Sequence, residues 1–331
     1  MALIITILIF IIVVVFLLNF IFFGPIISTS DNIKYQDGNS AQFQSEILFP
    51  QLIRYNDVFT LNYKTPCLIY RDTNGEHILG EDLKLDGITP TDDIIAGFHG
   101  FNSDSSEVKD LLKDYLNYKY SYYLATNNKS TISAIGFDMP GAETDVPGSY
   151  VNVTAQTYMK YVHDVMIRLD NIYKDITIIA SSTGCSYIIW FLYKFPELTK
   201  KISQIVFFSP NIEFHPFEKF VSEMALYPFG KKMVNLLDQR LFSDNGKQYF
   251  DSYQFIHLIG IMGLLRKIKF KLNVDIPMHI LYTSKDKVVS PKATVEFYEK
   301  YKGKKKLIDT KSLNHNIIKD VLEQEIDYYN E

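Results

Sequence analysis

The feature that most constrains the fold is a β-branched apolar run that ends abruptly in small residues. Residues 176–186 read ITIIASSTGCS. Four consecutive β-branched residues predict a buried strand, and the apolar stretch from Tyr187 to Tyr193 predicts a helix directly after it. Ser182 then lies at the bend where the strand turns into the helix.

The residues around Ser182 have the sizes that such a bend requires. Where a strand turns sharply into a helix around a nucleophilic serine, the two elements come into van der Waals contact, so small residues are needed two positions before and after the serine. Ala180 and Gly184 occupy these positions. The stretch fits a serine nucleophile at a sharp turn, but it fits equally well a small-residue turn in which Ser182 has no chemical role.

The overall composition excludes several classes of function. The 331 residues carry a formal net charge of −4, so the chain lacks the basic footprint of a nucleic-acid-binding protein. Cys67 and Cys185 are the only cysteines, which are too few for a metal site, and we do not expect a disulfide between them. The sequence therefore predicts no nucleic-acid partner, no metal and no cofactor.

The N-terminus is apolar enough to predict a membrane anchor. The run from Ala2 to Phe23 is interrupted only by Thr6 and Asn19, and about 20 such residues span the hydrocarbon core. No basic residue precedes the run, unlike in a cleaved signal peptide. We therefore expect a single-pass transmembrane helix at residues 1–24 and a polar linker at residues 25–60. The slight charge bias beyond the run favours a cytoplasmic location for the rest of the chain.

From about Leu61 onwards, strand patterns alternate with helix patterns. Short antiparallel strands open this region, among them residues 67–70, before a turn at residues 72–75. Further strands are expected at residues 93–101, 131–137, 176–181, 202–208, 277–283 and 306–310, with helices at 108–115, 156–172, 187–193, 291–301 and the C-terminus. This alternation predicts an α/β domain over residues 61–331, with a mostly parallel sheet covered by helices on both faces.

The alternation fails between about residues 211 and 273. Short amphipathic helical patterns replace it, and they end in a strongly apolar piece at residues 255–265. A helical insertion between two sheet strands, after the Ser182 bend, is where a lid over an active site would lie. We therefore predict a lid at residues 211–273.

Two further residues give Ser182 a chemical role. A serine hydroxyl is a weak nucleophile until an imidazole takes its proton, and a carboxylate must hold that imidazole in the correct tautomer. Asp286 and His315 each lie in a loop just past a predicted strand, and the three residues follow one another in the order serine, acid, histidine. Asp286 alone, beside Lys285 and Lys287, would pass for a solvated loop carboxylate, but the joint placement favours a catalytic triad.

The other candidates fit less well. Asp309 lies inside a predicted strand rather than after it. Four other histidines occupy a strand, a helix and the insertion, namely His279, His163, His215 and His257.

The chemistry of acyl transfer also requires two backbone N–H donors for the oxyanion. Thr183, directly after the nucleophile, is predicted to supply one, and Phe101, directly after His99 and Gly100, is predicted to supply the other. We interpret the His99 imidazole itself as structural.

Five motifs in order carry a resemblance to a known family. They are His99-Gly100-Phe101, Asp138-Met139-Pro140-Gly141, the Ser182 bend, Asp286-Lys287-Val288-Val289 and Asn314-His315. Together they resemble the monoacylglycerol lipase and lysophospholipase branch of the α/β-hydrolases, also called the serine aminopeptidase S33-like group, over about residue 61 to the C-terminus. Members of this group usually carry glycine where Ala180 stands, near Glu143, and close to Thr283 or Ser284. Alanine is still small, and the other two changes concern loop geometry rather than the catalytic atoms.

The resemblance implies a serine hydrolase that cleaves esters of single-acyl-chain lipids, such as monoacylglycerol or lysophospholipid, and the apolar N-terminus would anchor it to a membrane. An alternative is a proline-iminopeptidase-like serine aminopeptidase or another acyl transfer, because Glu213, Glu218 and Glu223 near the start of the predicted lid could hold a substrate amine. A non-catalytic binding module is the third alternative. It predicts the loss of a triad residue, and none is missing.

Overall fold

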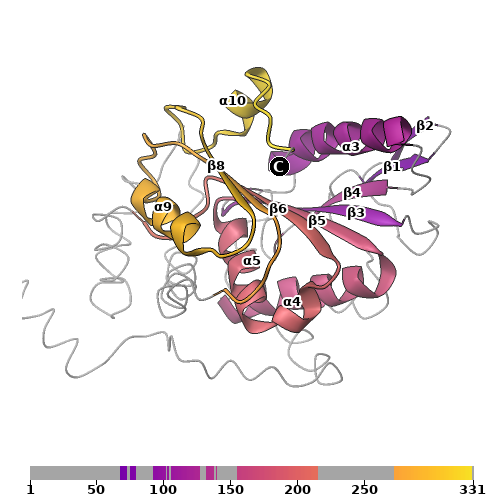
Figure 1. Cartoon of the computed structure of the whole chain (residues 1–331), viewed down its shortest axis with the longest axis horizontal. Coiled ribbons are helices and arrows are strands. Elements are labelled where there is room, and N and C mark those ends of the chain that lie inside the picture. Colours follow the sequence, from indigo (N-terminus) through magenta and orange to yellow (C-terminus); the bar gives the residue numbers. More distant parts are fainter. Residues whose placement is uncertain are drawn as a thin grey trace, which may run out of the picture.

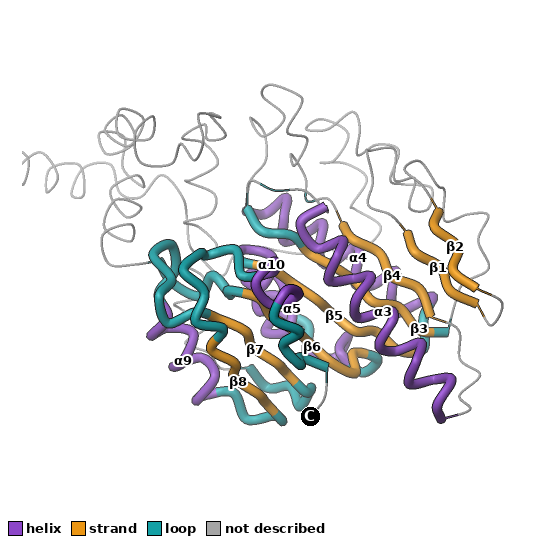
Figure 2. The backbone as a smooth tube through the Cα atoms, turned by 90° about the horizontal axis from the view of Figure 1, so that it is seen from above, coloured by secondary structure: helices purple, strands orange, loops and turns teal. Residues whose placement is uncertain are grey.

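The strands in the described part of the chain form one eight-stranded sheet in the order β2-β1-β4-β3-β5-β6-β7-β8 (Figure 2). The computed structural model describes residues 68–72, 75–79, 92–101, 103, 106–126, 132–137, 139, 155–214 and 272–329. The strands are β1 (Leu68–Asp72), β2 (Gly75–Leu79), β3 (Asp93–Phe98), β4 (Ile132–Phe137), β5 (Asp175–Ser181), β6 (Ile202–Phe208), β7 (Met278–Tyr282) and β8 (Lys305–Asp309). From β4 to β8 the six neighbouring strands run parallel, whereas β1 pairs antiparallel with both β2 and β4.

Helices cover both faces of this sheet (Figure 1). They are α3 (Ser106–Thr126), α4 (Ala155–Ile172), α5 (Thr183–Lys194), the short 3-10 helix η3 (Pro196–Thr199), α9 (Pro291–Lys300) and α10 (Ile318–Glu323). On one face α3 and α10 pack against alternate strand residues such as Ile95, Ile179 and Leu281. On the other face α4, α5 and α9 pack against the intervening residues, such as Ile94 and Ile178. Every residue of β3 and β4 is buried, as expected for parallel strands with both faces covered.

The helix α5 lies deepest. All ten residues from Thr183 to Leu192 are buried, including Trp190 and Phe191. Full burial of one such apolar side chain stabilises the fold by about 1.5–3 kcal/mol. The start of α5 is therefore held in the buried interior of the domain, directly after the end of β5.

The predicted mostly parallel sheet with helices on both faces is confirmed. The main difference in the elements concerns α3, which extends to Thr126 rather than ending at Tyr115. Leu116 and Tyr123 continue its buried stripe, so packing against the sheet prolongs the helix.

The predicted single-pass membrane localisation is corrected. Within the described part of the chain, no helix combines the length and the apolarity needed to cross a bilayer. The longest of these helices, α3, has 21 residues, but Glu107, Lys109 and Asp110 stand in its first turns. The predicted anchor at residues 1–24, the linker at 25–60 and almost all of the predicted lid at 211–273 lie outside the described residues.

Candidate active site

Ser182 occupies a strained turn between β5 and α5. Its backbone has φ 48° and ψ −115°, a conformation that non-glycine residues rarely adopt. Such strain costs about 1–3 kcal/mol and persists only where the surroundings enforce it. Here the Ser182 N–H donates to the Phe208 carbonyl oxygen (2.8 Å), and the Ser182 carbonyl oxygen accepts from the Asn211 N–H (3.0 Å). The end of β6 thus clamps the serine in its turn.

The turn needs a glycine at position 184 because the backbone of the neighbouring strand leaves no room for a side chain there. A Cβ at this position would lie 2.6 Å from the carbonyl oxygens of both Phe98 and His99, a distance that real Cβ contacts do not allow. The first turn of α5 therefore lies directly against the backbone at the end of β3. Ala180, on the other side of the turn, is fully buried but has room for its methyl group.

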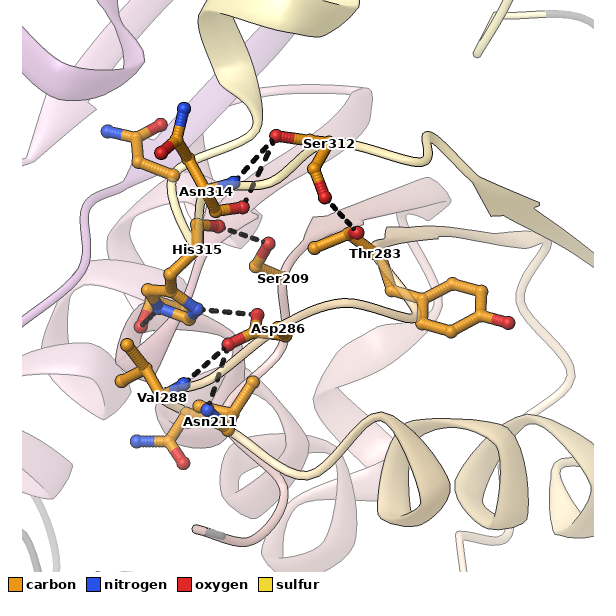
Figure 3. A network of polar contacts seen from close by, with 12 residues as sticks. Ser209, Asn211, Thr283, Asp286, Val288, Ser312, Asn314 and His315 are labelled. Atoms are coloured by element: carbon orange, nitrogen blue, oxygen red, sulfur yellow. Dashed lines mark hydrogen bonds and ion pairs between the residues drawn. The ribbon is translucent and has the colours of Figure 1, made fainter.

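The structure brings Ser182, His315 and Asp286 together at the carboxyl edge of the sheet. The Ser182 Oγ lies 2.9 Å from the His315 Nε2, and the His315 Nδ1 lies 2.7 Å from the Asp286 Oδ2 (the second contact is drawn in Figure 3). The three residues come from loops that follow β5, β8 and β7. This is the connected arrangement that activation of a serine hydroxyl requires.

The environment of Asp286 favours its ionised form. Burial by itself raises the pKa of this carboxyl group, but the hydrogen bond and charge of His315 and the N–H groups of Val289 and Val288 outweigh burial and lower the pKa below its ordinary value. Both N–H groups donate to Oδ1, at 3.0 Å and 2.8 Å, which leaves Oδ2 for the imidazole. The carboxylate is therefore charged and aimed at His315 at neutral pH.

The His315 loop is held by side-chain hydroxyl groups (Figure 3). Ser209 Oγ donates to the His315 carbonyl oxygen (2.6 Å), and Thr283 Oγ1 donates to the Ser312 carbonyl oxygen (2.5 Å). The Asn314 N–H in turn donates to Ser312 Oγ (3.0 Å). Thr283, which stands close to where related sequences are expected to have glycine, thus connects the acid loop to the histidine loop.

The two predicted oxyanion donors lie on segments that meet beside Ser182. Thr183 is the first residue of α5, so its N–H is among those that have no acceptor within the helix. Gly100, directly before Phe101, packs against Ser182: a Cβ on Gly100 would lie 3.0 Å from the Ser182 Cβ. The loop that carries Phe101 is therefore adjacent to the serine.

The His99 imidazole has two structural hydrogen bonds. The Met139 N–H donates to Nε2 (2.8 Å), so the neutral ring carries its proton on Nδ1, which donates to the Gly100 carbonyl oxygen (2.6 Å). His99 thus connects the loop after β3 to the loop after β4, in agreement with the structural role expected for it.

The rival candidates lie elsewhere. The His279 imidazole is buried against the Tyr328 carbonyl oxygen, and His163 on α4 pairs with Asp164. Asp309 ends β8 and binds Lys311 rather than His315. His215 and His257 lie outside the described residues. Within the described part, no group of three or more His, Cys, Asp or Glu side chains is arranged to hold a metal ion.

Cys185, one turn into α5, is buried rather than reactive. Its Sγ contacts the Ala180 carbonyl oxygen (3.2 Å). Burial raises the pKa of its thiol, and the nearby charge of Glu107 raises it further. The thiol therefore serves as packing beside the serine.

The site also includes two residues that the sequence analysis did not assign to it, Glu107 and Ser209. Glu107, directly before the helix expected at residues 108–115, accepts hydrogen bonds from the Gly100 N–H and the Ser181 hydroxyl group. Ser209 contacts His315, as described above. A possible sequence signal for Ser209 is its position directly after a buried strand, but nothing local indicates Glu107.

Two exposed apolar side chains lie close in sequence to His315 and Asp286. Leu313, two residues before His315, is 72% exposed, and Val288, two residues after Asp286, is 45% exposed. Each loop thus carries an exposed large apolar side chain two residues from Asp286 or His315, and we refer to this pair as the apolar rim.

Comparison with solved structures identifies the fold. One of the metagenome-derived lipolytic enzymes LipS and LipT matches with a TM-score of 0.52 at 14% identity, over 72% of this chain and 93% of that one. Alpha/beta hydrolase domain-containing protein 10 from mouse matches with a TM-score of 0.50 at 16% identity, over 72% of this chain and 88% of that one. No family model and no curated protein sequence matches. The chain therefore has the α/β-hydrolase fold, and the resemblance noted in its sequence is confirmed at the level of the fold.

Proposed function

We propose that this protein is a serine hydrolase that cleaves carboxylic esters through an acyl-enzyme. The observation that carries this proposal is the unbroken path from Ser182 Oγ to His315 Nε2 (2.9 Å) and from His315 Nδ1 to Asp286 Oδ2 (2.7 Å). It begins at a serine held in a strained turn, which is typical of a nucleophile in this fold.

The reaction follows from these contacts. Ser182 Oγ attacks the ester carbonyl carbon while His315 Nε2 takes the hydroxyl proton, and Asp286 stabilises the imidazolium that forms. The backbone N–H groups of Phe101 and Thr183 donate to the oxyanion. The imidazolium then protonates the departing alcohol. Water, deprotonated by the same imidazole, releases the carboxylic acid and restores the serine.

We propose single-acyl-chain lipid esters as the substrate class. The apolar rim formed by Val288 and Leu313 favours contact with an acyl chain, because each buried methylene stabilises a complex by about 0.8 kcal/mol. One similar structure is described as a lipolytic enzyme. A substrate whose chain lies against this rim should be cleaved faster as the chain lengthens.

The test combines labelling with a substrate series. A fluorophosphonate probe should label the wild-type protein and fail to label Ser182→Ala, and this variant should lose about 10³-fold or more in kcat. The matched control is Ser203→Ala. The Ser203 hydroxyl group, at the amino end of β6, donates to Asp175, and the probe should label this variant as it labels the wild-type protein. The kcat/KM for p-nitrophenyl esters should rise from acetate to decanoate.

Two outcomes would contradict the proposal. Full labelling of Ser182→Ala would move the nucleophile elsewhere. Faster cleavage of alanine or proline p-nitroanilide than of any ester would favour the aminopeptidase.

A further inference from the structure

The Glu107 carboxyl group contacts both segments that carry the proposed oxyanion donors, the loop with Phe101 and the turn with Thr183. Glu107, in the first turn of α3, uses one oxygen for each segment. Its Oε2 accepts from the Gly100 N–H (2.9 Å), and its Oε1 accepts from the Ser181 hydroxyl group (2.6 Å). Gly100 directly precedes Phe101, and Ser181 directly precedes the nucleophile. Glu107 therefore contacts the residue beside each part of the site.

Gly100 is packed between the nucleophile and this carboxyl group. A Cβ on Gly100 would lie 3.0 Å from the Ser182 Cβ on one side and 3.3 Å and 3.4 Å from the two Glu107 oxygens on the other. Ser181 and Gly100 are both buried. Glu107 itself is half-buried, so the bridge links a partly exposed carboxyl group to two buried partners.

The sheet itself does not fix these two segments to each other. The β3–β5 ladder ends with the pair Phe98 and Ala180. Ser181 is one residue past this last pair and Gly100 is two residues past it, so Glu107 connects the strands just where the ladder hydrogen bonds stop.

We propose that Glu107 is a positioning residue that holds the Phe101 and Thr183 N–H groups at the spacing an oxyanion requires. This inference rests on the proposed ester hydrolysis. Removing one oxyanion donor outright lowers kcat by about 10²–10³-fold. Because loss of Glu107 misaligns a donor without removing it, we expect a smaller decrease, of about 10-fold to 100-fold in kcat, with little change in KM.

The experiment compares Glu107→Ala with Glu107→Gln. The glutamine carbonyl oxygen can still accept from the Gly100 N–H, and its amide can donate to the Ser181 oxygen, so Glu107→Gln should recover most of the lost kcat. Rates are expressed per active site, titrated with a fluorophosphonate probe, so that misfolded protein does not count. Ser181→Ala removes one of the two contacts and should give a smaller loss than Glu107→Ala.

Two controls come from the same helix. Asp110→Ala removes an exposed carboxylate from α3 and should change nothing. Asp114→Ala removes the acceptor of the Tyr328 and Tyr329 hydroxyl groups, so it should lower stability but not the rate per active site.

A second readout separates positioning of the oxyanion hole from general damage. A trifluoromethyl ketone forms a tetrahedral oxyanion adduct with a serine, so its affinity should weaken in Glu107→Ala by about the same factor as kcat/KM. A wild-type rate per titrated site in Glu107→Ala, or unchanged ketone affinity, would overturn the inference while leaving the proposed function intact. If the wild-type protein neither labels nor cleaves any ester, the proposed function is overturned and this inference with it.

Discussion

The nucleophile turn and the histidine loop meet at one site, yet they are held in different ways. Ser182 is held by main-chain groups: its N–H binds β6, its carbonyl oxygen binds the Asn211 N–H, and Gly184 packs against the backbone of β3. His315 is held by side chains, namely the Ser209 hydroxyl group and the Asp286 carboxylate. Ser181, Thr183 and Gly184 around the turn are buried, Ser182 itself is half-buried, and the His315 side chain is 20% exposed.

This difference predicts two kinds of mutational response. A backbone contact cannot be removed by changing one side chain, but adding an atom at a tight contact forces the strand and helix apart. In the histidine loop, a single substitution removes a contact without disturbing the sheet. Changes in the turn should therefore cost stability, and changes in the histidine loop should cost turnover.

The largest expected effect is that of Asp286→Asn. An amide would hold the imidazole in the wrong tautomer, so kcat should fall about 10³-fold to 10⁴-fold while the protein stays folded. Ester turnover and circular dichroism measure the two quantities. A variant with more than a tenth of the wild-type kcat would exclude Asp286 from the triad.

Asp309→Asn is the matched control for that change. Asp309 binds Lys311 and the Ser284 N–H rather than His315, so turnover at neutral pH should stay close to wild type.

The same substitution should change how stability depends on pH. Burial raises the pKa of the Asp309 carboxyl group, but the hydrogen bonds from Lys311 and Ser284 lower it to about 2. Because the folded pKa lies below the unfolded value of about 3.9, the ionised carboxylate stabilises the fold above pH ~4 and loses this effect as the pH falls toward 2. Asp309→Asn should flatten the decline in stability over that window, measured by urea unfolding.

Gly184→Ala tests the main-chain side of the comparison. Its Cβ would collide with the carbonyl oxygens of Phe98 and His99, neither of which can rotate away. Overpacking of this kind costs about 1–3 kcal/mol, so urea unfolding should show a lower midpoint, and turnover should fall because Ser182 moves with the helix. Unchanged stability would mean that β3 and α5 can separate without cost.

Ser209→Ala should have the smallest effect, on the side-chain side of the comparison. Loss of one hydrogen bond to the His315 carbonyl oxygen costs about 0.5–1.5 kcal/mol, equivalent to a roughly 2-fold to 10-fold decrease in kcat if it is expressed mainly in the position of the imidazole. Ser186→Ala, which removes a buried hydroxyl group bound to the Asn211 carbonyl oxygen, is the stability-matched control. Equal losses of turnover in both variants would argue against a specific effect on His315.

Much of the fold was predictable because its signals are local. The parallel strands and the helices between them follow from hydrophobic periodicity, and the position of Ser182 at a bend follows from the small residues around it. The predicted helix after β3 ended too early because Leu116 and Tyr123 are fixed by packing against the sheet, which a local pattern does not report. The predicted membrane localisation is corrected for another reason: no helix in the described part of the chain is long and apolar enough to cross a bilayer.

The sequence by itself determined the α/β alternation, the serine at the turn and the order of serine, acid and histidine in loops after strands, because each depends on residues within a few positions. Only the tertiary structure decided which strands are neighbours. That choice brings Ser182 within 2.9 Å of a histidine 133 residues away, and it connects Glu107 to residues 7 and 74 positions away. Such contacts arise from the pairing of distant strands at one edge of the sheet, and no nearby residue encodes them.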